Sequence, residues 1–177
     1  PKQLEASAAK LMDALNTYEL AAWPEDPEPT FHEANQPDAI CRVIRPVLHD
    51  GLVNARIAWV FKKKLGAHIT AKMSLAGGAA GWIADKDYIC TVSWEAWKSL
   101  NARQRVALVD HELTHCVRNG ESEKWELLHH DIEEFHSIAG RWGSWHHGLH
   151  KFRMALKSNQ YELHLEDGGK AKESKAK

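Results

Sequence analysis

The pattern H-E-x-x-H at residues 111–115 constrains this chain more than any other feature. On an α-helix, residues four positions apart lie on one face, so His111 and His115 can bind the same metal ion. Glu112 lies beside them, where its carboxylate can take a proton from a metal-bound water. These residue types at this spacing are typical of the active site of a zinc peptidase. The pattern therefore predicts a helix with a metal site on one face.

The sequence around the motif predicts a helix over residues 102–118. Asn101, followed three residues later by Gln104, indicates a capping box, which begins a helix. Apolar residues then recur at helical spacing and predict a face that packs on a core: Val106, Val109, Leu113 and Val117. The dipeptide Asn119-Gly120 ends the pattern, because glycine is common just beyond the last helical turn.

A catalytic zinc ion needs a third protein ligand and one open coordination position. Candidates lie in residues 129–136, a segment that also predicts a helix, folded back over the first. His130 and Glu134 share a face of that helix, so either could bind the metal while the other orients a ligand. Asp131 is a further candidate for the orienting role, as is Asp110. Other histidines are weaker candidates, because a lone histidine is more often a surface residue: His129, His136, His146, His147 and His150.

The remaining pattern predicts an α+β fold. We expect a first helix over residues 4–20, a Pro-rich connector over 23–37 and a helix over 38–48. Three short segments with alternating or β-branched apolar residues then predict a small antiparallel sheet: residues 55–62, 67–75 and 82–92. This sheet should pack on the H-E-x-x-H helix and its flanking helices.

Length and charge bound the class of protein. The 177 residues predict one domain over 1–159 and a largely disordered tail over 160–177. A formal net charge of −1 does not favour nucleic acid or an anionic membrane as a partner. Nucleic-acid contact would depend on the lysines of 62–64 and of the tail. No apolar run is long enough to cross a membrane, and no signal peptide is evident. Three cysteines without a C-x-x-C pair suit reduced thiols in a cytoplasm.

Five sequence runs together resemble the putative phage metallopeptidase family, whose members are encoded by bacteriophages and prophages. The runs are Val-Asp-His-Glu-Leu-Thr-His-Cys at 109–116, His-Asp-x-Glu-Glu-Phe at 130–135, Arg-Trp-Gly-x-Trp at 141–145, Asn-Ala-Arg-Ile-Ala-Trp at 54–59 and Trp-Glu-Ala-Trp-x-x-Leu at 94–100. The resemblance covers about residues 38–145. It implies a minimal zincin-like fold, a Zn²⁺ cofactor and a place in the cytoplasm of a bacterial host.

The layout is also similar to SprT-like and ImmA-like minimal zinc peptidases. SprT-like proteins supply a third histidine at the start of the next helix, ahead of a phenylalanine, and this favours His130. ImmA-like proteins supply a glutamate from that helix, and this favours Glu133 or Glu134. The resemblance to the first group makes His130 the preferred third ligand, with Glu134 as the alternative.

The predicted function is hydrolysis of a peptide bond in a protein or peptide substrate. Glu112 is the expected general base, and His111, His115 and His130 are the expected zinc ligands. A second electrophile is usual in such sites, and Tyr88, His146 and His147 are the candidates. The alternative is a non-catalytic, zinc-stabilised module that contacts protein or DNA. Glu112 favours the enzyme, because a purely structural zinc site does not need a carboxylate there.

Overall fold

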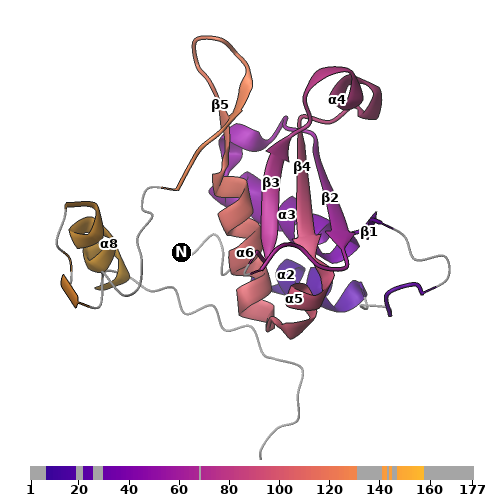
Figure 1. Cartoon of the computed structure of the whole chain (residues 1–177), viewed down its shortest axis with the longest axis horizontal. Helices are drawn as coiled ribbons and strands as arrows, with labels where there is room; N and C mark the ends of the chain where they lie inside the picture. Colours follow the sequence, from indigo (N-terminus) through magenta and orange to yellow (C-terminus); the bar gives the residue numbers. More distant parts are fainter. Residues whose placement is uncertain are drawn as a thin grey trace, which may run out of the picture.

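A computed structural model describes residues 7–18, 22–25, 30–67, 69–130, 141–142, 144 and 147–157. It confirms the α+β class: six α-helices, a four-stranded sheet and a separate two-stranded hairpin lie within these residues. Helices pack behind the sheet, and helix α6 runs beside its edge strand β3 (Figure 1). None of the described helices is both long enough and apolar enough to span a bilayer. The division into a domain over 1–159 and a tail over 160–177 stays a prediction, and the tail lies outside the described residues.

The first two described helices, α2 (Ala8–Thr17) and α3 (Asn35–Leu48), correspond to the two predicted at the N-terminal side. α3 begins three residues earlier than expected, inside the predicted connector. Both helices bury one apolar face, and α2 packs on α3. The buried residues of these faces are Leu11, Ala14, Leu15, Ile40, Cys41 and Ile44. A short 3₁₀ helix, η1 (Asp50–Leu52), follows α3.

The sheet is mixed, so the prediction of a purely antiparallel sheet of three strands is wrong. Its order is β1 (His32–Glu33), β2 (Ile57–Lys62), β4 (Tyr88–Ser93) and β3 (Ala71–Leu75). β2 and β4 are parallel, whereas the other two pairs are antiparallel. After β2 the chain forms the edge strand β3, and it then returns to form β4 between β2 and β3. β4 therefore runs antiparallel to β3 and parallel to β2. β1 has only two residues and gave no periodic signal in the sequence.

The third strand begins six residues later than predicted, because residues 78–84 form helix α4 (Gly78–Ala84). Trp82 and Ile83, which suggested a strand, lie on α4 and are 84% and 75% exposed. Asp85 ends the helix in the left-handed region with φ of 53°. Hydrophobicity alone could not separate these exposed apolar residues from those of a buried strand.

Helix α6 (Ala102–Thr114) carries the H-E-x-x-H motif and begins with the predicted capping box. The Asn101 side chain accepts from the backbone N–H of Gln104, and the Gln104 side chain accepts from the backbone N–H of Asn101. A short helix, α5 (Trp94–Ser99), precedes it. Val106, Val109 and Leu113 are buried, as the apolar pattern predicted.

The predicted helix over 102–118 extends too far, because α6 ends at Thr114. Residues 116–118 instead form strand β5 (Cys116–Arg118), which pairs with β6 (Trp125–Leu127) in an antiparallel hairpin. Asn119 begins the hairpin loop, where its side chain accepts from the backbone N–H groups of Glu121 and Ser122. The dipeptide at 119–120 therefore begins a hairpin loop rather than ending a helix.

The predicted helix over 129–136 falls largely outside the described residues. Of that segment, His129 and His130 are described, and they lie in the irregular stretch that follows β6. Further along the chain, helix α8 (His147–Lys157) is described.

Candidate metal centre

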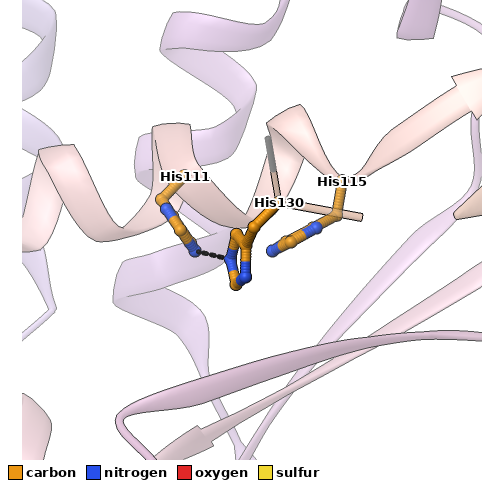
Figure 2. Close-up of side chains that lie close together, drawn as sticks. All are labelled: His111, His115 and His130. Atoms are coloured by element: carbon orange, nitrogen blue, oxygen red, sulfur yellow. Dashed lines mark hydrogen bonds between the residues drawn. The ribbon is translucent and has the colours of Figure 1, made fainter. Parts of the chain in front are cut away.

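Three histidines from two parts of the chain meet beside α6. His111 lies in the last turn of α6, His115 is its C-cap residue, and His130 arrives from the stretch after β6 (Figure 2). One ring nitrogen from each lies within 4.8 Å of the others. The Nε2 atoms of His111 and His130 are 3.1 Å apart. The cluster that the structure forms is thus the set of three histidines that the sequence favoured.

The distance between two of these nitrogens is close to that between two ligands of one zinc ion. Zinc bound tetrahedrally at about 2.0–2.1 Å from each nitrogen would place two ligand atoms roughly 3.3–3.4 Å apart. The separation between His111 and His130 is close to this value. Imidazole nitrogens suit zinc and several other transition metals, so the donor set could bind metal without fixing which one.

A hydrogen bond fixes the tautomer of His115. Its Nδ1 lies 2.7 Å from the carbonyl oxygen of Leu128. A carbonyl can only accept, so Nδ1 must carry the proton, and this leaves the lone pair of Nε2 for a metal. Such a contact from the unused nitrogen is the usual way in which proteins orient a ligand histidine.

His111 is biased toward its neutral form. Burial lowers the pKa of His111, and the neighbouring His115 and His130 lower it further, against a smaller opposite effect of Asp110. Histidine binds metal as the neutral imidazole. The surroundings of His111 therefore favour the protonation state that a metal ligand needs.

Glu112 is buried beside the histidines, with only 3% of its surface exposed. Burial raises the pKa of Glu112, whereas His115 and a hydrogen bond from the backbone of Met73 act in the opposite direction. Its Oε2 atom has no hydrogen-bond partner among the residues that the structure describes. A buried carboxylate oxygen without a partner is costly, and such atoms are concentrated at functional sites.

Glu112 and the histidines border a hollow of about 320 Å³ between α6, β3 and the end of the β5–β6 hairpin. Its lining residues are Ala71, Lys72, Met73, His111, Glu112, His115, Leu127, Leu128, His129 and His130. An oxygen ligand placed in the hollow could contact both the histidine cluster and the carboxylate. The arrangement can therefore hold a metal ion and a water molecule next to a base.

In the described part of the chain no strand pairs with the outer side of β3, so β3 presents a free edge to this side of the sheet. The carbonyl of Thr70 and the N–H of Ala76 bond to the backbone at the two ends of β4, at 2.8 and 2.9 Å. Backbone groups alternate in direction along a strand, so those of the odd-numbered residues 71, 73 and 75 point away from β4. The backbone N–H of Met73 is accordingly the one that reaches Glu112.

Several other sequence candidates lie elsewhere. The Tyr88 hydroxyl contacts the β5–β6 hairpin and not the hollow, so its proposed role as an electrophile is wrong. The carboxylate of Asp110 lies 2.7 Å from Nε2 of His49, which sequence reasoning did not single out. Five candidates lie outside the described residues: Asp131, Glu133, Glu134, His136 and His146.

The groups that sequence reasoning missed are mostly backbone atoms. The Leu128 carbonyl and the Met73 N–H act through the main chain, so the residue type at these positions carries no signal. Only the pairing of the hairpin and the position of the edge strand bring them to the site.

The chain was compared with models of known protein families. The model described as "Putative phage metallopeptidase" matches residues 31–156, which include β1, α6, the hairpin and all three histidines. The resemblance expected from residues 38–145 is thus confirmed over a longer stretch. Comparisons with curated proteins and with solved structures give no match.

Proposed function

This chain belongs to the Putative phage metallopeptidase family, and from this premise we propose that it is a zinc-dependent peptidase acting on a host or phage protein in the bacterial cytoplasm. One observation carries the proposal: buried Glu112, whose Oε2 atom has no partner among the described residues, borders the same hollow as the three-histidine cluster. A metal-bound water would supply the partner that this atom lacks.

The chain's own residues divide the chemistry between them. His111, His115 and His130 would hold the zinc ion, with His115 oriented by the Leu128 carbonyl. When bound, zinc supplies a water of lowered pKa and a Lewis acid for the substrate carbonyl. Glu112 would act as the general base that takes a proton from the attacking water, and would then pass that proton to the departing amine. Burial raises the pKa of Glu112, and a raised pKa brings a carboxylate closer to the range that suits a general base and acid.

The free edge of β3 supports a peptide as the substrate. An extended chain can add to such an edge by backbone hydrogen bonds, independently of its side chains. Ala71 and Leu75 offer outward-facing backbone groups on either side of Met73, which lies next to Glu112. The backbone carbonyls of a peptide aligned in this way would lie along the hollow.

A non-catalytic binding module fits the site less well. Such a module would gain nothing from a buried carboxylate oxygen without a partner, which costs stability. Nucleic-acid contact through residues 62–64 also receives little support, because the Lys64 ammonium lies 3.3 Å from the carboxylate of Glu95. The charge of this turn is thus partly neutralised within the chain.

The function is tested by N-terminal proteomics of host cells that express wild type or Glu112→Gln. This substitution keeps the size of the side chain but removes the base, so cleavage should fall about 100- to 10,000-fold. Glu95→Gln on α5 is the matched control, because it makes the same chemical change at a half-exposed site. New termini that persist unchanged in Glu112→Gln would contradict a peptidase and favour the binding module.

The ligand set is tested by metal analysis of purified protein. We expect about one zinc per chain in wild type, and loss of zinc in His111→Ala and His130→Ala. His150→Ala on α8 serves as the control, because this histidine is exposed. Full zinc occupancy in His130→Ala together with loss in Glu134→Ala would show that Glu134 is the third ligand instead.

A further inference from the structure

Tyr88 is the first residue of β4, and its side chain is fully buried. Its hydroxyl oxygen lies 2.8 Å from the carbonyl oxygen of Glu126 and 3.0 Å from that of Val117. The same oxygen accepts from the backbone N–H of Val117 at 3.2 Å. Val117 lies on β5 and Glu126 lies opposite it on β6. One hydroxyl therefore ties both strands of the hairpin to the central sheet.

The far end of this hairpin is part of the candidate metal centre. Leu128 follows β6 directly, and its carbonyl accepts from Nδ1 of His115 at 2.7 Å. The backbone N–H of Leu128 also donates to the carbonyl of His115 at 2.8 Å. His130 lies two residues further along and reaches Nε2 of His111. The position of the hairpin thus determines both the orientation of His115 and the reach of His130.

The ring of Tyr88 and its hydroxyl have separable roles. The ring packs against Trp125 of β6, with centroids 5.9 Å apart and planes at 65°, and phenylalanine could make the same contact. The three polar contacts belong to the hydroxyl alone. A buried hydroxyl must find partners, and here both of the residues that supply them lie on the hairpin. Removing only this oxygen should therefore loosen the hairpin while the core stays packed.

We propose that Tyr88 is a positioning residue of the metal centre, whose hydroxyl holds the β5–β6 hairpin where Leu128 orients His115 and His130 completes the cluster. This role rests on the proposed function, because it assumes that the three histidines bind zinc. Tyr88 touches neither the metal site nor the hollow. Its effect on the metal would pass entirely through the hairpin.

The first experiment measures zinc affinity by competition with a chromophoric chelator for wild type and Tyr88→Phe. Loss of a residue that holds a metal ligand in place without touching the metal typically weakens metal binding about 10- to 100-fold. We expect the zinc affinity of Tyr88→Phe to fall by a factor in this range. Leu11→Ala on α2 is the control, because it weakens the core at a helix that packs on α3. This control should lower the melting temperature and leave zinc affinity unchanged. Unchanged affinity in Tyr88→Phe would overturn the proposal.

If His111→Ala loses zinc binding while Tyr88→Phe binds zinc normally, the role of Tyr88 is rejected and the proposed metal centre still stands. Absence of zinc binding in wild type would reject both.

Hydrogen exchange gives a readout that does not depend on metal. In metal-free Tyr88→Phe, the amide of Leu128 should exchange faster, whereas the amides of β2 should keep their protection. Faster exchange throughout β2 as well would show a general loss of fold and overturn a specific role for the hydroxyl.

Discussion

At the scale of single residues, Glu112 combines two properties that oppose each other. Its carboxylate is buried, and one of its oxygens has no partner in the described part of the chain, which destabilises the metal-free protein. The same isolation raises the pKa of Glu112 and suits it to proton transfer. Catalytic groups often reduce stability in this way, because the site is arranged for the reaction rather than for the free protein.

This opposition predicts that Glu112→Gln stabilises the metal-free protein at pH 7, because burial raises the pKa of Glu112. A carboxyl whose pKa is raised by folding destabilises the fold only where it would be ionised in the unfolded chain. The loss of stability caused by Glu112 is therefore absent well below pH 4.5, which is the ordinary pKa of a glutamate. It grows as the pH rises toward the pKa of folded Glu112. Thermal melts in chelator at pH 4 and pH 7 measure it. A melting temperature of Glu112→Gln equal to or below that of wild type at pH 7 would contradict this account.

At the scale of elements, α4 is held against the end of β3 by a close backbone approach. A Cβ atom added at Gly81 would lie 1.7 Å from the carbonyl oxygen of Ala76, which is far inside contact distance. The residue before α4, Gly77, has open space around its Cα and an ordinary φ of −82°. The two glycines thus differ in packing although they lie four residues apart.

We predict that Gly81→Ala lowers the free energy of unfolding by about 1–3 kcal/mol, because α4 must move away from Ala76. Gly77→Ala is the matched control and should change stability by less than about 0.5 kcal/mol. Urea unfolding of the two variants measures the difference. Equal stabilities would show that α4 can shift at no cost.

A second element-scale contact joins the starts of the parallel strands β2 and β4. The Asp87 carboxylate accepts from the backbone N–H of Arg56 at 2.8 Å and from its guanidinium at 2.7 and 3.0 Å. These bonds from Arg56 hold the pKa of Asp87 below its ordinary value of 3.8. Asp85 also pairs with the same guanidinium.

The linkage gives Asp87 a defined pH dependence. A carboxyl whose pKa is lowered by folding stabilises the fold above its unfolded pKa, and this contribution is lost as the pH falls through the folded value. Asp87→Asn should therefore lower stability by about 1–2 kcal/mol at pH 7. The difference from wild type should shrink as the pH falls below about 3.8. If urea unfolding gives the same difference in stability between Asp87→Asn and wild type from pH 7 to pH 2, this pH dependence of Asp87 is contradicted.

The elements show what the sequence could predict and what it could not. The capping box of α6 and its buried face are local, and they were correctly predicted from Asn101, Gln104 and the apolar spacing. The end of α6 was not, because β5 forms through pairing with β6 and through the distant hydroxyl of Tyr88. The parallel pairing of β2 with β4 likewise depends on the order in which strands enter the sheet.

At the scale of the whole molecule, the candidate site unites parts that the sequence separates. His111 and Glu112 could be recognised from five adjacent residues, but His130 required a choice among many later histidines. The Leu128 carbonyl and the free edge of β3 could not be found from residue types at all. They appear at the site only after α6, the hairpin and the sheet have assembled.

This assembly predicts that metal binding stabilises the whole fold. The cluster brings together α6 and the end of the hairpin, which the unfolded chain leaves apart, so zinc should bind the native state far more tightly. A ligand at 100 times its dissociation constant adds about 2.7 kcal/mol, which for a chain of this size corresponds to roughly 5–10 °C in melting temperature. We expect a chelator to remove this increment and added zinc to restore it. His111→Ala should melt at the same temperature with or without chelator. If stripped and zinc-loaded wild type melt together, the three histidines do not couple metal binding to folding, and the centre would be an accessory on a core that is stable without it.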